Sequence, residues 1–406
     1  MQTSNIPLIV GSAAAGAAVC ALVMTLRAKE AAPSSHAPNS ETDFESAHSV
    51  VWRSIGGAMQ ASQLYLGDRL KLYSTLRAMC ADEGSSVTAP ELARASGLKV
   101  RWLREWMAQQ AAMGVLVLLP GDGDDDDDLR YRLPRAMATV LADEASPEYD
   151  VALVQMVPAL VSRAKTALPG AFATGLGLPY NDPDVSEAID RAHRKHIHHC
   201  VLPRVLPAAQ LPRGASVHAA LAAGARVADL GCGGGSLVKV LAQAYPKSTF
   251  HGYEVSDQAL ACCATSLAGV PNAQAHDARN EPLGDAAENF DVVFTLDVLH
   301  DAPFPSNLIA QVKRVLSPKG VWLLADIAGL PGVRANLEAN PAAATMYAFS
   351  TCLCMSCALS EPGGEGLGTL GFSVPVAKHM LGAHGFGDVQ VLLEADNTRW
   401  FQVRAT

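Results

Sequence analysis

The sequence has little positive charge. Its 31 lysine and arginine residues are outnumbered by 40 aspartate and glutamate residues, which gives a formal net charge of −9 at pH 7. No stretch gathers lysine and arginine into the basic cluster that proteins binding nucleic acid usually carry. The charge balance therefore argues against a phosphate-rich partner, and we expect no nucleic acid among the partners.

The chain also lacks a disulfide framework. Its nine cysteines are an odd number without the spacing of a small secreted scaffold, so a reducing compartment fits better. Only 17% of the residues are charged and 49% are hydrophobic, which excludes a disordered chain. At 406 residues the chain exceeds a usual single core, and more than one domain is expected.

One long stretch, residues 6–26, has no charge and could cross about 30 Å of hydrocarbon as a helix. Arg27 and Lys29 follow it and nothing basic precedes it, which predicts a single-pass anchor with the catalytic part in the cytosol. The alternative is a targeting segment that is removed, which would leave a soluble protein. We assign residues 1–30 to this segment and residues 31–46, rich in proline and serine, to a linker.

Residues 47–146 have the pattern of a mainly helical, winged-helix domain. Thr88 and Glu91 form a capping box that opens a helix, and Gly97 ends that helix. A second helix at residues 100–114 precedes two apolar runs that flank an acidic loop, the pattern of a hairpin wing.

This wing disfavours DNA as a partner. Residues 121–128 contain six aspartates, which a duplex with one negative charge per ~1.7 Å would repel. Consecutive aspartates cannot all converge on one ion, so a solvated loop is expected and not a cation site. The domain is then expected to pack against the catalytic part or to pair two chains in a homodimer.

A glycine-rich turn follows the apolar run 225–228. It contains Asp229, Gly231, Gly233 and Gly235, and a helix begins directly after it. Glycines let backbone N–H groups approach a ligand closely, but dinucleotide-binding dehydrogenases have a similar loop. An acid at Asp229 would repel a pyrophosphate, whereas it suits the ammonium and sulfonium of S-adenosylmethionine.

Two further acids end the next two predicted strands. Glu254 could accept hydrogen bonds from both ribose hydroxyls of a nucleoside, and Asp277 from the adenine amino group. The alternation of strands and helices then continues and closes with a hairpin. It predicts a Rossmann-like, doubly wound α/β domain with a seven-stranded sheet over residues 223–406. The predicted elements are strands 290–295 and 320–327, helix 306–316, turn 317–320, and hairpin strands 389–394 and 399–403.

The motif at residues 227–235, together with Glu254, Asp277 and residues 291–301, resembles class I S-adenosylmethionine-dependent methyltransferases. From about residue 50 to the carboxyl end, the chain is similar to a little-characterised methyltransferase family with an N-terminal winged helix. The resemblance implies S-adenosylmethionine as cofactor, with Asp297 beside it, and methyl transfer to oxygen or nitrogen of a small molecule. It does not imply a metal.

His300 is the residue expected to carry the chemistry. In similar O-methyltransferases a histidine of a His-Asp pair removes the proton of the acceptor hydroxyl, and a neutral imidazole near pH 7 suits this role. Asp326, at the end of the next strand, could orient it. The alternative is that His300 only lines the pocket, and Ala302 follows where such enzymes usually have an aromatic residue.

The acceptor pocket is expected between the winged-helix domain, a helical connector at residues 147–222 and a lid at about 330–370. Its predicted lining is partly apolar and consists of Tyr180, His196, Tyr347 and Met355. Two other interpretations stay open. One is a cofactor-binding transcriptional regulator, and the other a thiol-dependent metalloid methyltransferase using Cys352, Cys354 and Cys357. A zinc site at His196, His199 and Cys200 is disfavoured because two ligands on one helix face are too few.

Overall fold

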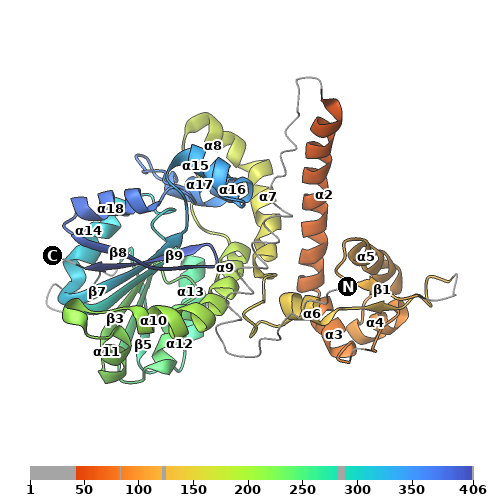
Figure 1. Cartoon of the computed structure of the whole chain (residues 1–406), viewed down its shortest axis with the longest axis horizontal. Helices are drawn as coiled ribbons and strands as arrows, with labels where there is room; N and C mark the ends of the chain where they lie inside the picture. Colours follow the sequence, from red (N-terminus) through yellow and green to blue (C-terminus); the bar gives the residue numbers. More distant parts are fainter. Residues whose placement is uncertain (1–42, 83, 121–124, 281–282, 284–288, 405–406) are drawn as a thin grey trace, which may run out of the picture.

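The computed structural model describes residues 43–82, 84–120, 125–280, 283 and 289–404. A helical N-terminal domain lies on one side and a sheet domain on the other, and the long helix α2 stands between them (Figure 1). Within the described ranges, no helix is both long and apolar enough to span a membrane. The predicted anchor at residues 6–26 lies outside them.

Helix α2 (Phe44–Arg69) begins inside the predicted linker, so the linker prediction is wrong from Phe44 onward. The Asp43 side chain starts the helix by accepting the backbone N–H of Ser46 at 3.1 Å. Near its other end, Gly67 packs on the ring of Tyr73, where a Cβ would lie 2.4 Å from the ring. A glycine at this position is therefore what lets α2 and α3 approach each other.

The winged-helix prediction is confirmed. Thr88 N–H donates to Glu91 Oε2 at 2.8 Å, Glu91 N–H donates to Thr88 Oγ1 at 3.3 Å, and Gly97 ends the helix with a φ of 73°. A short antiparallel hairpin forms the wing. The elements are α3 (Leu72–Met79), α4 (Ala89–Ser96), α5 (Val100–Ala112), β1 (Val117–Leu118), β2 (Tyr131–Arg132) and α6 (Arg135–Ala142).

The acidic wing is not simply solvated. Arg104 Nε, on α5, donates to Asp127 Oδ1 at 2.7 Å, and a second hydrogen bond joins the same two side chains. In a DNA-binding winged-helix protein, the helix that corresponds to α5 would face the duplex. Here the positive charge of Arg104 on that helix is already neutralised by Asp127.

A helical connector joins the two domains. It consists of η1 (Ala152–Met156), α7 (Val157–Thr166), α8 (Leu168–Thr174), α9 (Pro183–His196), η2 (Ile197–Val205), α10 (Leu206–Ala208), η3 (Pro212–Gly214) and α11 (Val217–Ala223). Asp182 caps α9 by accepting the N–H groups of Asp184 and Val185. Helix α9 continues directly into the π-helical segment η2.

The seven-stranded sheet is confirmed, with strand order β5-β4-β3-β6-β7-β9-β8. Strands β3 to β7 are parallel, and β9 and β8 close the sheet as an antiparallel hairpin. The strand order reverses between β3 and β6, the place where open α/β sheets bind ligands at their carboxyl edge. The strands are β3 (Arg226–Leu230), β4 (Thr249–Glu254), β5 (Ala273–Asp277), β6 (Phe290–Leu296), β7 (Leu316–Ile327), β8 (Asp388–Ala395) and β9 (Thr398–Arg404).

Two loop predictions had different outcomes. The final hairpin turns through Asp396 and Asn397, both with positive φ (52° and 59°), as a tight two-residue turn requires. The turn expected at residues 317–320 is instead part of β7, where the pairing with β6 shifts register between Phe290 and Val292.

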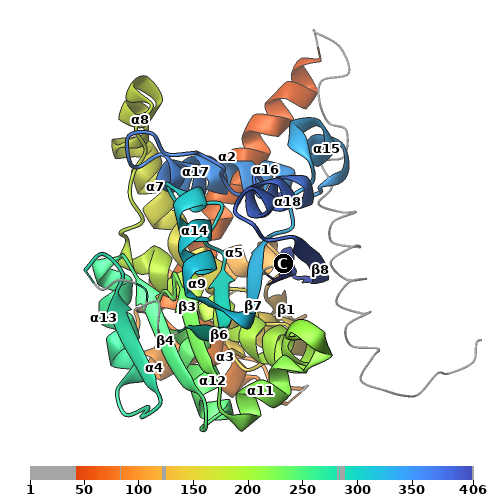
Figure 2. The same ribbon diagram turned by 90° about the vertical axis from the view of Figure 1, so that its left-hand side faces the viewer.

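Helices cover both faces of the sheet, and the lid lies above its carboxyl edge (Figures 1 and 2). The helices of the sheet domain are α12 (Ser236–Ala244), α13 (Asp257–Leu267), α14 (Pro305–Val315) and α18 (Val374–Ala383). The lid comprises α15 (Gly332–Ala339), α16 (Ala343–Phe349), η4 (Ser350–Cys354) and α17 (Met355–Ala358). The connector rests directly on it: Gly177 N–H donates to Leu359 O at 2.8 Å, and a Cβ on Gly177 would lie 1.9 Å from Ser356 O.

Candidate active site

The glycine loop after β3 depends on glycine at two positions. Gly231 and Gly235 have φ values of 75° and 80°. A Cβ would come within 2.7 Å of Val298 Cγ2 at Gly231 and of Cys263 Sγ at Gly235. Gly233 also has positive φ, but its ideal Cβ meets nothing within 4 Å. The loop is thus tightly packed at Gly231 and Gly235 and open at Gly233.

Asp229 is the unusual group of this loop. Asp229 is the next-to-last residue of β3 and is only 4% exposed, and its Oδ1 atom finds no hydrogen-bond partner among the described residues. Burial, with a smaller contribution from Glu254, raises the pKa of Asp229 to about 8. A buried carboxylate with an oxygen that lacks a partner is stabilised by a cation, so the site fits a cofactor that carries an ammonium.

Glu254 holds the neighbouring turn in place. Its Oε2 accepts the N–H of Gly233 at 2.9 Å, and its Oε1 accepts those of Val255 and Ser256 at 2.7 and 2.9 Å. Oε1 already accepts two hydrogen bonds, so the acceptor site that remains is on Oε2. The predicted contact therefore remains possible for one ribose hydroxyl, while this carboxylate also orders the glycine loop.

Asp277 is already paired in the structure. Arg279 Nε donates to its Oδ1 and Arg279 Nη2 to its Oδ2, both at 2.8 Å, while Asn280 donates at 2.9 Å. The Arg279 hydrogen bonds hold the pKa of Asp277 well below its usual value. An adenine amino group would have to share these oxygens with Arg279. The sequence pattern did not predict this ion pair.

Asp297 lies between two histidines. It follows β6 in a left-handed backbone conformation with φ 64°, which is uncommon for a residue other than glycine and often marks functional sites. His193 Nε2, from α9, lies 3.7 Å from its Oδ2, and His300 Nδ1 lies 3.6 Å from its Oδ1. Burial would raise the pKa of Asp297, but these histidines outweigh it and lower the pKa.

His300 and Asp326 form a buried pair. His300 Nδ1 lies 2.8 Å from Asp326 Oδ1, and both residues are 1% exposed. Asp326 Oδ1 also accepts the N–H of Ile327 at 2.7 Å, whereas Oδ2 has no partner within the part of the chain that the structure describes. This contact is the one through which Asp326 would orient the imidazole ring.

The expected neutral imidazole is not supported. Burial alone would lower the pKa of His300, but Asp326, helped by the thiol of Cys354, outweighs it and raises the pKa well above the usual value. Without a nearby positive charge, His300 therefore favours its protonated form at neutral pH. A bound cationic cofactor would shift it back toward the neutral form that a base needs.

Two half-buried groups complete the cluster. Burial and the carboxylates of Asp297 and Asp326 raise the pKa of Asp301 to about 7, although His300 opposes the shift. Tyr180, from the connector, has its pKa raised by burial and then by Asp301, so this predicted lining residue does lie beside the acidic cluster. Neither Asp301 nor His193 was predicted from the sequence to be a site residue. The spacing of His193, three residues before His196 on one helix, was the available signal.

The other predicted lining residues are placed less directly. His196 is buried, its Nε2 accepts Trp400 Nε1–H at 3.0 Å, and its ring stacks on that indole. It also helps to lower the pKa of Asp297, so it lies near the acidic cluster, and its contact with the acceptor stays a prediction. Met355 borders Gly368, whose N–H donates to His300 O at 2.9 Å. Tyr347 is half-buried on α16, and its role stays a prediction.

The geometry around His300 also bears on the two alternatives of a metal site and a thiol-dependent metalloid site. Asp297, His300 and Asp326 offer three ligand atoms within 4.8 Å of one another. Across the described residues no other group of three His, Cys, Asp or Glu side chains comes this close. The three lid cysteines therefore do not converge as a metalloid site requires, and His196, His199 and Cys200 do not form a zinc site.

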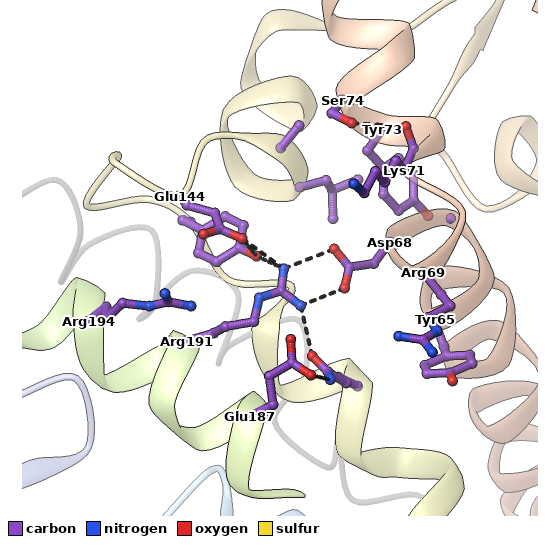
Figure 3. A pocket seen from close by; sticks show the side chains of 15 residues that line it. Tyr65, Asp68, Arg69, Lys71, Tyr73, Ser74, Glu144, Glu187, Arg191 and Arg194 are labelled. Atoms are coloured by element: carbon purple, nitrogen blue, oxygen red, sulfur yellow. Dashed lines mark hydrogen bonds and ion pairs between the residues drawn. The ribbon is translucent and has the colours of Figure 1, made fainter. Parts of the chain in front are cut away.

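A cavity of about 340 Å³ lies away from His300, between α2, α3 and α9 (Figure 3). The guanidinium of Arg191 points across it to Asp68 and Glu144. Arg191 Nη1 donates to Asp68 Oδ2 at 2.7 Å and to Gln155 Oε1 at 3.0 Å, and Nη2 donates to Asp68 Oδ1 at 3.0 Å. This network joins the N-terminal domain to the helix that carries His193.

Comparison with known proteins adds the family. Residues 221–390 match the family described as a methyltransferase domain. The chain therefore contains a methyltransferase domain over these residues. Its cofactor is S-adenosylmethionine, and the Oδ1 atom of Asp229, which has no hydrogen-bond partner among the described residues, is compatible with the positive charge of that cofactor.

Curated relatives match a part of the chain. A trans-aconitate 2-methyltransferase of Methylobacterium nodulans is 32% identical over 142 residues, covering 32% of this chain and 54% of the relative. A fatty-acid O-methyltransferase of Mycolicibacterium smegmatis is 31% identical over 105 residues, covering 25% and 37%. The matches thus span about half, or less, of the relatives' own length.

Solved structures share the whole two-domain plan. Human N-acetylserotonin methyltransferase in complex with S-adenosylmethionine superposes with a TM-score of 0.63 at 15% identity, covering 90% of this chain and 99% of that one. Mitomycin 7-O-methyltransferase gives 0.60 at 19% identity, covering 90% and 100%. At this identity the likeness establishes the fold, including the winged-helix domain in front of the methyltransferase domain.

Proposed function

We propose that the protein transfers the methyl group of S-adenosylmethionine to an oxygen atom of a small molecule, with His300 as the proton acceptor. The observation that carries the proposal is the 2.8 Å contact between His300 Nδ1 and Asp326 Oδ1 at the carboxyl edge of the sheet. When bound, S-adenosylmethionine supplies a methyl group that its sulfonium makes electrophilic.

The residues of the chain would divide the work as follows. Asp229 and Asp297 stabilise positive charge, and Glu254 orders the glycine loop and accepts from the ribose. His300 takes the proton of the acceptor hydroxyl, and Asp326 stabilises the imidazolium that results. A neutral amine needs only proximity and alignment, so a buried histidine held by a buried carboxylate favours oxygen over nitrogen as the accepting atom.

The charge of the site supports a neutral or phenolic acceptor. Asp229, Glu254, Asp297, Asp301 and Asp326 all influence one another's ionisation or that of His300. A carboxylate acceptor would be repelled by this cluster. The trans-aconitate and fatty-acid enzymes above, by their names, act on acids. We therefore do not assign the acceptors of those enzymes to this chain.

The rival functions have less support. A dehydrogenase would place a pyrophosphate near Asp229, whose carboxylate opposes it. A DNA-binding regulator would need Arg104 free, and that side chain is paired with Asp127. Attachment to a membrane through residues 6–26, with the catalytic part in the cytosol, is a separate prediction that alkaline extraction of membranes would test.

The deciding experiment combines methyl transfer with cofactor binding. The full chain is incubated with methyl-labelled S-adenosylmethionine and a metabolite extract, and labelled products are identified by mass spectrometry. We expect His300→Ala to lose at least about 100-fold in rate while S-adenosylhomocysteine still raises its melting temperature. His198→Ala, an exposed histidine on η2, is the control. A His300→Ala protein that keeps its rate would refute the base role, and stabilisation by NAD in place of S-adenosylhomocysteine would refute the methyltransferase assignment.

A further inference from the structure

Helix α9 of the connector packs against the glycine loop that follows β3. A Cβ on Gly234 would lie 2.9 Å from Asp190 Oδ1, so α9 contacts the loop at this glycine. His193 follows Asp190 by three residues, which places both side chains on the same face of α9. Its Nε2 atom lies 3.7 Å from Asp297 Oδ2. This face of α9 therefore meets the site next to Gly233, where the loop is open.

Two contacts hold α9 in place around His193. Two residues before it, Arg191 donates hydrogen bonds to Asp68 of the N-terminal domain at 2.7 and 3.0 Å. Three residues after it, His196 stacks on Trp400 of β9 and accepts the indole N–H at 3.0 Å. The helix is thus fixed to a different element on either side of His193, and a binding side chain on such a rigid element is well preorganised.

His193 has one ring nitrogen available to a ligand. Its Nε2 atom faces Asp297, whereas its Nδ1 atom makes no hydrogen bond with any of the residues that the structure describes. The side chain is 25% exposed, so a ligand can reach it. A protonated histidine has a donor on each ring nitrogen, so one ring can face Asp297 and a second anion at the same time.

The cofactor brings such an anion into an acidic site. The methionine part of S-adenosylmethionine carries a carboxylate as well as an ammonium. Asp229 Oδ1, which has no hydrogen-bond partner among the described residues, suits the ammonium. The carboxylates of Asp229, Glu254 and Asp297 would repel the carboxylate of the cofactor. The site therefore needs a basic group that offsets this repulsion.

The other basic groups beside α9 are engaged elsewhere. Arg194 borders the cavity that the Arg191 guanidinium crosses, away from His300 (Figure 3). His300 is 1% exposed and its Nδ1 atom contacts Asp326 at 2.8 Å. Its other nitrogen is the one that the proposed reaction uses. His193 is therefore the basic group best placed for the carboxylate of the cofactor.

We propose that His193 binds the carboxylate of S-adenosylmethionine, with Asp297 facing the other nitrogen of the same ring. Asp229 remains the partner of the ammonium, so each charged group of the methionine part meets an opposite charge. The connector then determines cofactor specificity, because His193 recognises the carboxylate. The inference rests on the cofactor and does not depend on the proposed oxygen acceptor or on His300 as the base.

Calorimetry of the full chain with two ligands tests the proposal. The ligands are S-adenosylmethionine and its decarboxylated form, which keeps the ammonium and the sulfonium. Charge alone would favour the decarboxylated form in an acidic site. We expect the wild-type chain instead to bind S-adenosylmethionine at least about tenfold more tightly. His193→Gln should lose this preference because it weakens the binding of S-adenosylmethionine only, and His193→Lys should retain it because a lysine keeps the positive charge.

The matched control is His198→Gln, which changes an exposed histidine on η2 and should keep the wild-type preference. His300→Ala should keep it as well, so a failure of this inference can be told apart from a failure of the base role. Binding of the decarboxylated form by His193→Gln, with wild-type affinity, shows that the variant is folded. A wild type without a preference would overturn the proposal. So would an equal loss of affinity for both ligands in His193→Gln, or a preference that this variant retains.

Discussion

Arg191 on the connector and Asp68 on α2 form a two-point ion pair with N–O distances of 2.7 and 3.0 Å, and their side chains are 11% and 17% exposed. A planar guanidinium matches a carboxylate in this geometry better than an ammonium can. Tyr149, Glu144 and Gln155 also contact the same guanidinium. Arg191 is therefore the main polar link between the N-terminal domain and α9.

We expect Arg191→Met to destabilise the protein by about 2–4 kcal/mol, because it leaves Asp68 partly buried without its cation. Arg191→Lys should recover only a small part of the lost stability, since a lysine cannot form both hydrogen bonds to Asp68. Thermal unfolding measures the effect. Arg101→Met, which removes an exposed ion pair with Glu105, is the control and should cost less than 1 kcal/mol. Equal losses in the two variants would contradict the assignment.

Asp229→Asn should stabilise the protein without cofactor as pH rises. The pKa of Asp229 is raised from 3.8 to about 8, so the folded state holds a proton that the unfolded state loses near pH 4. The free energy of unfolding then falls as pH rises from about 4 to about 8. An asparagine does not titrate, so the variant loses this pH dependence. The melting-temperature difference should grow from pH 5 to 8.5, by about 2–4 °C for each kcal/mol.

The same variant should bind S-adenosylmethionine at least about tenfold more weakly, because the ammonium loses its carboxylate. Calorimetry measures this affinity. In the wild type, binding should release a proton below pH 8 and strengthen as pH rises. Affinity that does not change with pH in the wild type would show that Asp229 does not meet the cation.

The pKa of His300 should depend on Asp326 and on the bound cofactor. Without cofactor its pKa is raised, so the neutral base form is scarce at pH 7 and increases with rising pH. We expect NMR titration to show this raised pKa, and Asp326→Asn or addition of S-adenosylmethionine to lower it. Methyl transfer should accordingly decline as pH falls through the pKa. A pKa near 6.5 that Asp326→Asn does not move would argue against the pair.

Gly231→Ala should impair the cofactor loop more than a glycine substitution elsewhere. Gly231 combines a φ of 75° with a Cβ position 2.7 Å from Val298, so an alanine meets both backbone strain and a clash. Gly269→Ala is the matched control, because its φ is 81° and its Cβ would meet nothing within 4 Å. We expect about 1 kcal/mol for the control and more for Gly231→Ala, with loss of S-adenosylhomocysteine binding only in the latter.

Local chemistry made the sheet and the caps predictable from the sequence. Thr88 and Glu91 need only each other, and Asp229, Glu254 and Asp297 stand at or next to the ends of strands, which must meet at one sheet edge. Helix α2 was not predicted, because its apolar residues face outward and its amino-terminal end lies in a segment of linker composition. His193 was given no role because helical periodicity does not say which face of α9 meets the sheet edge. The raised pKa of His300 depends on contacts that only the folded chain brings together.

The contact of Gly177 with the lid has a mechanical consequence. The backbone at residues 177–178 hydrogen-bonds to Leu359 and Ser356, and no side chain separates the two segments. A swing of the lid on hinges at its own ends would have to break these backbone hydrogen bonds or carry the connector with it. Opening of the His300 site would be a rigid-body displacement of both segments together, and its rate would be set by the contacts that they jointly make with the sheet.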